Sequence, residues 1–361
     1  MLPNCTRCET IPNKIEGEGT LYLWFPVGHT TSKVISALDQ INQSYQLLED
    51  NEGCQVYFDP KNEELINVLT TKLTNKELRE TQALWISGTR EPQFRDFSRV
   101  TSLHNFISLN KAEWLLDVLA SERLTCHFQP LVYAEDTSRI FAQEALLRGI
   151  DEQGNLISPG RIFSHAYDAG LVFKLDAFAR QIAIREANQH GIEQLIFINF
   201  SPTAVYDPTT CLRMTVRAIN EAGIPHDRVV FEVMESEQPP DIKHLIKILK
   251  FYQDAGFKIA LDDFGTGYSN LNLISALSPD FIKLDRDLIS NIDRNPQKAV
   301  ITKKLLEIAQ HLQIKTIAEG IETLEELHWA QEHKATFIQG FLIAKPQSPP
   351  VTNTPLFDVL T

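Results

Sequence analysis

Eight short apolar segments recur between residues 128 and 341, and longer amphipathic stretches separate most of them. The short segments have the length of buried strands, and the stretches between them have the length and periodicity of helices. The predicted strands are Phe128–Val132, Phe141–Arg148, Leu195–Ser201, Arg228–Glu235, Lys258–Gly265, Phe281–Arg286, Lys315–Ile321 and Phe337–Phe341. The predicted helices include Lys174–Gln189, Asp241–Ala255 and Gln297–Leu312. This alternation favours an α/β fold, a closed TIM-type (β/α)8-like barrel, over an open doubly wound sheet.

The first hundred residues do not share this alternation. Strand-like segments there are followed by helix-like stretches at residues 31–48 and 62–85. In the first stretch, helical spacing predicts a core-facing stripe of Val34, Leu38, Ile41, Tyr45 and Leu48. A chain of 361 residues exceeds the usual size of one domain. We therefore predict a smaller α+β domain at residues 1–107, for which we hypothesise a regulatory role, and the barrel at residues 108–361.

The composition limits the compartment and the classes of partner. A net charge of −13 gives no basic excess for binding a nucleic acid polymer. The sequence shows no membrane span and no secretory signal, so we expect a cytoplasmic protein. The five cysteines, an odd number, indicate reduced thiols. Cys5 and Cys8 form a CxxC pair, for which two free thiols are a simpler interpretation than a metal site that needs two further ligands.

Carboxylates gather at or near the C-terminal ends of the predicted barrel strands. They are Glu144, Glu232, Asp262, Asp263, Asp285 and Glu319, and Asn199 has an equivalent position. Any one of them alone is most simply a solvated acid at the junction of a strand and a loop. In a parallel barrel, however, these strand ends meet at one mouth. So many acids cannot all stay ionised close together unless cations neutralise them.

The ligand types indicate which cations these are. Oxygen ligands without His or Cys suit Mg²⁺ or Mn²⁺ better than zinc. The adjacent Asp262 and Asp263 directly follow the apolar KIAL segment and can address two neighbouring ions. Two ions about 3.5–4 Å apart are a recurrent arrangement in enzymes that hydrolyse phosphodiesters.

Motifs in this part of the chain resemble those of the EAL family of cyclic di-GMP phosphodiesterases. They are FQP at 128–130, EALLR at 144–148, NFSP at 199–202, EVME at 232–235, DDFGTGYSNL at 262–271, KLDR at 283–286, AEGIET at 318–323 and QGF at 339–341. They occur in the family's order over roughly the last two-thirds of the chain. The resemblance implies a cyclic-guanylate-specific hydrolase, a barrel whose first strand runs antiparallel to the rest, and a homodimer formed through the barrel. The implied reaction is in-line attack of an activated water on one phosphodiester of cyclic di-GMP, which gives linear pGpG.

The resemblance also implies roles for individual residues. One metal ion would be held by Glu144, Asn199, Glu232 and Asp262. The second would be held by Asp262, Asp263 and Glu319, with Asp262 bridging the two ions. Lys283 would contact the attacking water or the phosphate, Arg148 a ligand phosphate, Gln129 and Gln339 would line the site, and Glu235 would brace the loop after Asp263. Lys283, Glu319 and Glu235 are thus the predicted catalytic residues.

Two departures from the family pattern leave alternatives open. Gly149 replaces the usual Trp after the motif arginine, and Met234 replaces the usual Thr between two glutamates. Neither position is a predicted metal ligand, so we expect effects on affinity or regulation. One alternative function is a catalytically silent cyclic di-GMP receptor that signals through a protein partner. Such a receptor is expected to lack several metal ligands, whereas this chain has the whole set. A purely structural interaction protein would leave the clustered acids unexplained.

Overall fold

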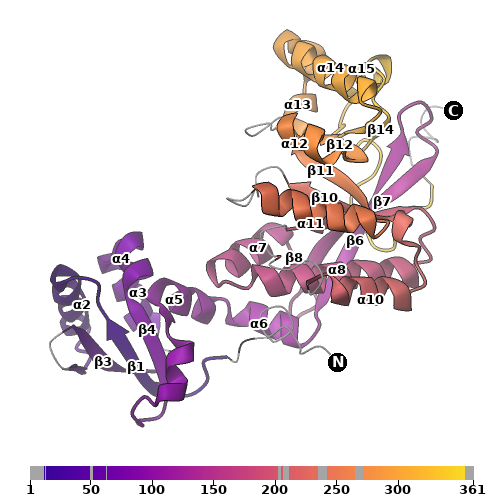
Figure 1. Cartoon of the computed structure of the whole chain (residues 1–361). Helices are drawn as coiled ribbons and strands as arrows, with labels where there is room; N and C mark the ends of the chain where they lie inside the picture. Colours follow the sequence, from indigo (N-terminus) through magenta and orange to yellow (C-terminus); the bar gives the residue numbers. More distant parts are fainter. Residues whose placement is uncertain are drawn as a thin grey trace. The chain divides into compact units, whose positions relative to one another are not determined.

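The computed structural model describes residues 12, 14–48, 52–61, 63–201, 205, 211–234, 242–264 and 271–353. Internal contacts group residues 11–122 and 160–172 into one compact unit. Residues 123–159 and 173–361 belong to the other unit, which contains the barrel (Figure 1). The boundary predicted at residues 107 and 108 falls within helix α5 (Leu103–Lys111) and stays a prediction.

The smaller unit is built on a five-stranded antiparallel sheet with the strand order β2-β3-β1-β4-β5. Its strands are β1 (Gly19–Trp24), β2 (Tyr45–Leu47), β3 (Gly53–Phe58), β4 (Gln82–Ser87) and β5 (Thr101–Ser102). Successive side chains of a strand point to opposite faces of the sheet. Leu21 and Leu23 of β1 accordingly join a core with the helices, while Tyr22 packs with Leu84 and Ile86 in a separate cluster. The α+β architecture predicted for this region is confirmed.

Two helix predictions in this unit were too long. Its helices are α2 (Gly28–Gln40), α3 (Glu63–Lys72), α4 (Asn75–Glu80), α5, α6 (Glu113–Ala120) and α7 (Pro159–Asp168). The helix predicted at residues 31–48 ends early because Asn42 adopts a left-handed backbone conformation with φ of 52°, and β2 follows. The stretch at 62–85 likewise divides into α3, α4 and most of β4, since Thr74, which caps α4, and Thr81, which follows it, are both extended. Apolar periodicity continues across these breaks and conceals them.

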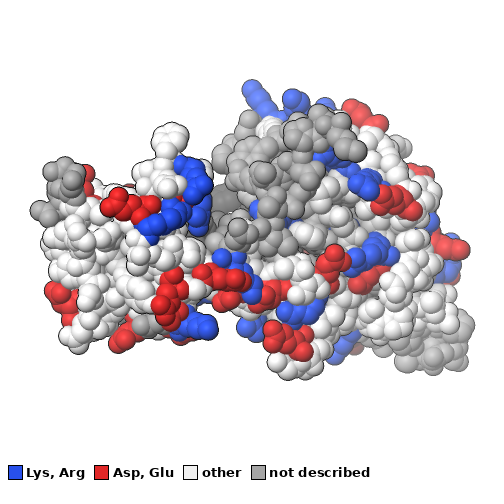
Figure 2. All heavy atoms as spheres, turned by 90° about the horizontal axis from the view of Figure 1, so that it is seen from below, with Lys and Arg blue, Asp and Glu red and all other residues white. Residues whose placement is uncertain are grey.

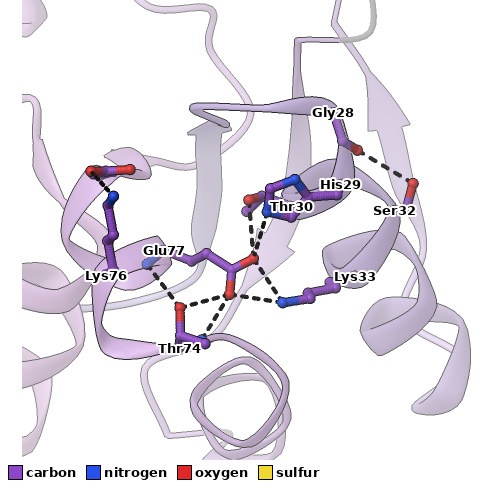
Figure 3. A network of polar contacts seen from close by, with 9 residues as sticks. Gly28, His29, Thr30, Ser32, Lys33, Thr74, Lys76 and Glu77 are labelled. Atoms are coloured by element: carbon purple, nitrogen blue, oxygen red, sulfur yellow. Dashed lines mark hydrogen bonds and ion pairs between the residues drawn. The ribbon is translucent and has the colours of Figure 1, made fainter.

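A buried carboxylate joins α2 to α4 in the smaller unit (Figure 3). Glu77 completes a capping box with Thr74 and pairs with Lys33, whose Nζ lies 2.9 Å from both carboxylate oxygens. The Thr30 hydroxyl donates a third contact, 3.2 Å from Oε1. Backbone donation at Thr74 and the Lys33 ammonium together lower the pKa of Glu77 to about 2.

We expect Glu77→Ala to lower the free energy of unfolding of the smaller unit by about 1–2 kcal/mol, because a helix cap and a partly buried ion pair are lost together. Since the folded pKa lies below the ordinary value of 4.5, this stabilisation should be complete above about pH 4.5 and disappear as pH falls towards 2. Hydrogen exchange of the α4 peptide measures the change. Glu80→Ala, which breaks only the exposed pair with Lys76, is the control and should change little. Equal effects of the two variants would contradict this assignment.

The second unit is a closed barrel of eight strands. They are β6 (Leu124–Tyr133), β7 (Ile140–Ile150), β9 (Leu195–Phe200), β10 (Val229–Met234), β11 (Lys258–Phe264), β12 (Phe281–Leu284), β13 (Lys315–Ala318) and β14 (Phe337–Ile338). β6 pairs antiparallel with both β7 and β14, and the other strands of the ring pair in parallel. The short β8 (Leu156–Ile157) extends β7 outside the ring. All eight predicted strands and the antiparallel first strand are confirmed.

Helices connect the strands around the barrel (Figure 1). They are α8 (Val172–Gln189), α10 (Arg213–Glu221), α11 (Ile242–Asp254), α12 (Leu271–Leu277), α13 (Arg286–Ile289), α14 (Pro296–His311) and α15 (Leu324–Glu332). Local signals fix several of their starts. Asn295 caps α14 ahead of a proline, and Thr323 with Glu326 forms the capping box of α15. Among the described helices, none has both the length and the apolar character required to cross a membrane.

The barrel is filled by one apolar layer to which every strand contributes one buried side chain. The layer consists of Leu131, Ala142, Phe197, Val230, Ala260, Phe281, Ile317 and Phe337. Phe141 packs against it, with its ring 3.7 Å from that of Phe337 between centroids. Bulky apolar layers of this kind make the interior of a TIM-type barrel a packed core rather than a pore. The core therefore closes the floor beneath any site at the carboxyl ends of the strands.

Candidate metal and ligand site

A layer of eight polar side chains lies directly above the apolar layer. In each parallel strand the polar residue stands two positions after the core residue, and in the antiparallel β6 it stands two positions before it. Because side chains alternate with a period of two, both sets point into the barrel. The polar layer consists of Gln129, Glu144, Asn199, Glu232, Asp262, Lys283, Glu319 and Gln339. Every one of these residues was a predicted site residue.

Asp263 joins this layer through an irregularity of β11. Neighbouring residues of a regular strand point to opposite faces, so Asp262 and Asp263 should not share a site. The pairing of β11 with β12 shifts register between Leu261 and Phe264, and Asp263 has a positive φ of 55°. Bulges commonly redirect a side chain next to a functional site. Here oxygen atoms of Asp262, Asp263 and Glu319 all lie within 4.8 Å of one another.

Lys283 lies at the centre of the acids and is almost completely buried. Its ammonium nitrogen is 2.6 Å from Oε1 of Glu232 and 2.6 Å from Oε1 of Glu319. It is also 3.4 Å from Oδ1 of Asp262 and 3.6 Å from Oε2 of Glu144. One ammonium thus contacts carboxylates from four different strands.

Amide side chains fix the orientation of Glu144. Gln339 donates to its Oε2 at 2.7 Å, and Asn199 donates to its Oε1 at 3.3 Å. The Gln339 amide also donates to Gln129 at 3.3 Å, and Gln129 donates to the carbonyl of Ala344 at 3.0 Å. This chain of hydrogen bonds leaves Glu144 little rotational freedom.

The acids respond differently to their shared burial. Burial raises the pKa of Glu232 well above its ordinary value, and the neighbouring Glu144 adds to the effect. Burial also raises the pKa of Glu319 to about 8 and, together with Asp262, that of Asp263 to about 6. Burial alone would lower the pKa of Lys283, but the surrounding carboxylates outweigh it and raise that pKa well above the usual range. Without cations, the cluster therefore retains protons near neutral pH.

The acid cluster fits a pair of divalent cations. Five carboxylates and one ammonium leave four negative charges when all are ionised, which two divalent ions would balance. Oε2 of Glu232 is completely buried and has no hydrogen-bond partner among the described residues. A buried oxygen of this kind calls for a ligand. Metal ions would replace the protons that the acids otherwise retain.

An open cavity of about 220 Å³ leads to the cluster. The predicted residues that line it are Gln129, Glu144, Asp262, Lys283, Glu319 and Gln339. Six other lining residues have no predicted role: Leu146, Arg286, Gly320, Glu322, Gly340 and Phe341. All of them lie inside the EALLR, KLDR, AEGIET and QGF motifs, and this position is the sequence signal that could identify them.

The remaining predicted residues lie elsewhere or outside the described residues. The Arg148 guanidinium donates to the carbonyl of Leu147 at 2.8 Å, and Arg148 is not among the described residues that line the cavity. Gly149 is buried in β7 between Leu124 and Ile157. Glu235, the loop at 265–270 and the Cys5–Cys8 pair lie outside the described residues, so the roles predicted for them stay predictions. The ligand and metal assignments likewise stay predictions.

Comparison with known proteins places these motifs in a family. The model of the EAL domain matches residues 112–346. The cyclic di-GMP phosphodiesterase NbdA of Pseudomonas aeruginosa is 28% identical over 72% of this chain and 33% of its own length. The cyclic di-GMP phosphodiesterase PdeR of Escherichia coli is 29% identical over 64% of this chain and 35% of its own length. This chain thus spans about a third of the length of these curated relatives.

Solved structures show the same fold. A standalone EAL protein from Vibrio cholerae, in a form bound to c-di-GMP, is 32% identical and has a TM-score of 0.58. The match covers 64% of this chain and 96% of that protein. The PaMucR phosphodiesterase in complex with c-di-GMP is 26% identical with a TM-score of 0.60, over 66% of this chain and 97% of that one. With most of the barrel matched by the family model, this chain belongs to the EAL domain family.

Proposed function

We propose that this chain hydrolyses cyclic di-GMP to linear pGpG with two bound divalent metal ions. The observation that carries the proposal is the polar layer in which Lys283 contacts four carboxylates beside the close group of Asp262, Asp263 and Glu319. Such a layer on an apolar floor is suited to charge stabilisation because little water competes with it. The relatives named as cyclic di-GMP phosphodiesterases and the c-di-GMP-bound structures support this substrate.

Each side chain of the layer has a separate task in this proposal. Asp262 would bridge the two ions, with Glu144, Asn199 and Glu232 on one side and Asp263 and Glu319 on the other. When bound, the ions supply positive charge that stabilises the phosphoryl oxygens and lowers the pKa of the attacking water. The Lys283 ammonium adds a fixed positive charge next to the position of the scissile phosphate. Gln339 and Asn199 hold the Glu144 carboxylate in place.

The receptor function is the second candidate, and the complete polar layer argues against it. A silent receptor needs only contacts to the ligand, and it gains nothing from placing four carboxylates around one buried lysine, since buried charges are costly. The choice between Mg²⁺ and Mn²⁺, the homodimer through the barrel, the cytoplasmic location and a regulatory role of the smaller unit stay predictions.

On the face of the molecule shown in Figure 2, Lys and Arg are interspersed with Asp and Glu, without a large patch of either sign among the described residues.

We expect turnover of cyclic di-GMP to require added Mg²⁺ or Mn²⁺ and to fall below detection in excess chelator, because the proposed ligands are all oxygen atoms. Product analysis by chromatography, with pGpG as the expected product, measures this. Adding either metal back should restore the rate, which separates metal removal from denaturation. Full turnover in excess chelator would contradict the two-metal mechanism. Tight binding of cyclic di-GMP without any turnover in either metal would support the receptor function instead.

A further inference from the structure

The cavity has a second positively charged side chain at its mouth. Of the described residues that line it, two are cationic, Lys283 and Arg286. Lys283 is buried and already contacts four carboxylates. Arg286 begins α13, directly after β12, and more than half of its side-chain surface is exposed. Its guanidinium is therefore within reach of a ligand that enters the cavity.

The arginine side chain has a defined position. It lies across Gly320, where any Cβ would collide with it, and its Nη2 is 2.8 Å from Oε1 of Glu322. Glu322 also lines the cavity, so the ion pair stands at the rim. Exposed pairs of this kind contribute little to stability, which makes the arginine available for exchange to another anion.

Among the described residues, no Lys or Arg other than these two lines the cavity. Arg148 donates to backbone carbonyls of its own strand, and the Lys345 ammonium lies 5.5 Å from the Phe341 ring centroid without lining the cavity. Of the cations in the described part of the chain, Arg286 is thus the one best placed for a negative charge at the cavity entrance.

We propose that Arg286 binds the phosphodiester of cyclic di-GMP that is not cleaved, leaving Glu322 as it does so. This inference rests on the proposed function for the identity of the ligand. Cyclic di-GMP carries two phosphodiesters, and the metal ions engage one of them. The planar guanidinium offers two parallel donors to the oxygens of the other. Glu322 keeps the guanidinium at the rim until the ligand arrives.

The test compares matched variants of the full chain by calorimetric titration with cyclic di-GMP in excess chelator, so that turnover does not interfere. Arg286→Ala should weaken binding about tenfold, as expected for the loss of a charge-assisted contact. Arg286→Lys should weaken binding less, because lysine keeps the positive charge but lacks the parallel N–H donors of the guanidinium. Glu322→Gln should bind as tightly as wild type or more tightly, since it releases the guanidinium. Lys345→Met removes a nearby charge outside the cavity lining and should change affinity less than twofold.

The opposite pattern would overturn the proposal. If Arg286→Ala and Glu322→Gln weaken binding equally, the ion pair only holds the start of α13 against the loop after β13. Unchanged affinity of Arg286→Ala also overturns it. Wild-type protein that binds cyclic di-GMP but does not hydrolyse it with either metal would refute the proposed hydrolysis and leave the Arg286 contact standing. Wild-type protein that neither binds the nucleotide in chelator nor hydrolyses it with either metal would refute both. Thermal unfolding, monitored by circular dichroism, confirms that each variant is folded.

Discussion

Lys283→Met is expected to lower kcat/KM for cyclic di-GMP by about a hundredfold to a thousandfold, the loss typical of removing one preorganised charge from an active site. The methionine fills much of the same space but leaves Glu232 and Glu319 without their ammonium at 2.6 Å. Removing one partner of a buried ion pair also destabilises a protein by about 3–5 kcal/mol. The measurement is therefore made on metal-loaded protein whose fold has been verified by circular dichroism. Formation of pGpG reports the rate.

Lys315→Met provides the matched control, because it makes the same replacement at the other end of the barrel. Lys315 starts β13, is exposed, and lies over the rings of Phe141 and Phe281 at 5.8 and 5.7 Å. Residues at that end of a TIM-type barrel contribute to stability rather than to chemistry. We expect this variant to keep its turnover within about twofold. A Lys283→Met protein that folds and retains full turnover would show that Lys283 is not required for the reaction.

The barrel could be predicted because its local and long-range patterns agree. Each strand is a short apolar run that ends in a polar residue, so the sequence alone indicates both the strand and the direction of its carboxyl end. The inward alternation of Phe197 and Asn199, or of Phe281 and Lys283, follows from a period of two once the strands are known. The antiparallel β6 gave no such signal, and only the family resemblance supplied its direction.

Other features depend on contacts that no local pattern encodes. The bulge that turns Asp263 into the site arises from a register shift between β11 and β12, and the adjacent aspartates alone do not reveal it. In the smaller unit, the break after Gln40 depends on the left-handed Asn42 and on pairing of β2 with β3. Tertiary pairing there overrides the helical periodicity of the segment. The ion pair of Arg286 and Glu322 likewise joins the start of α13 to the loop after β13.

Asp262→Asn and Asp263→Asn are expected to reduce turnover of cyclic di-GMP by about a thousandfold or more, yet to differ in how many metal ions remain bound. Asp262 would bridge both ions, so its replacement should weaken both sites. Asp263 would contact only the second ion, so its replacement should leave one site intact. Asparagine tolerates a left-handed φ, so the backbone at residue 263 can keep its 55° conformation.

Calorimetric titration with Mn²⁺ distinguishes the two variants, with two ions expected for wild type, one for Asp263→Asn and none at the same concentrations for Asp262→Asn. Asp254→Asn, at the exposed end of α11, makes the same replacement away from the cavity and should bind and react like wild type. Equal metal binding by the two active-site variants would contradict a bridging role for Asp262. If Asp263→Asn keeps both ions and full turnover, the β11 bulge does not supply a metal ligand. The second ion must then be held by Asp262 and Glu319 alone.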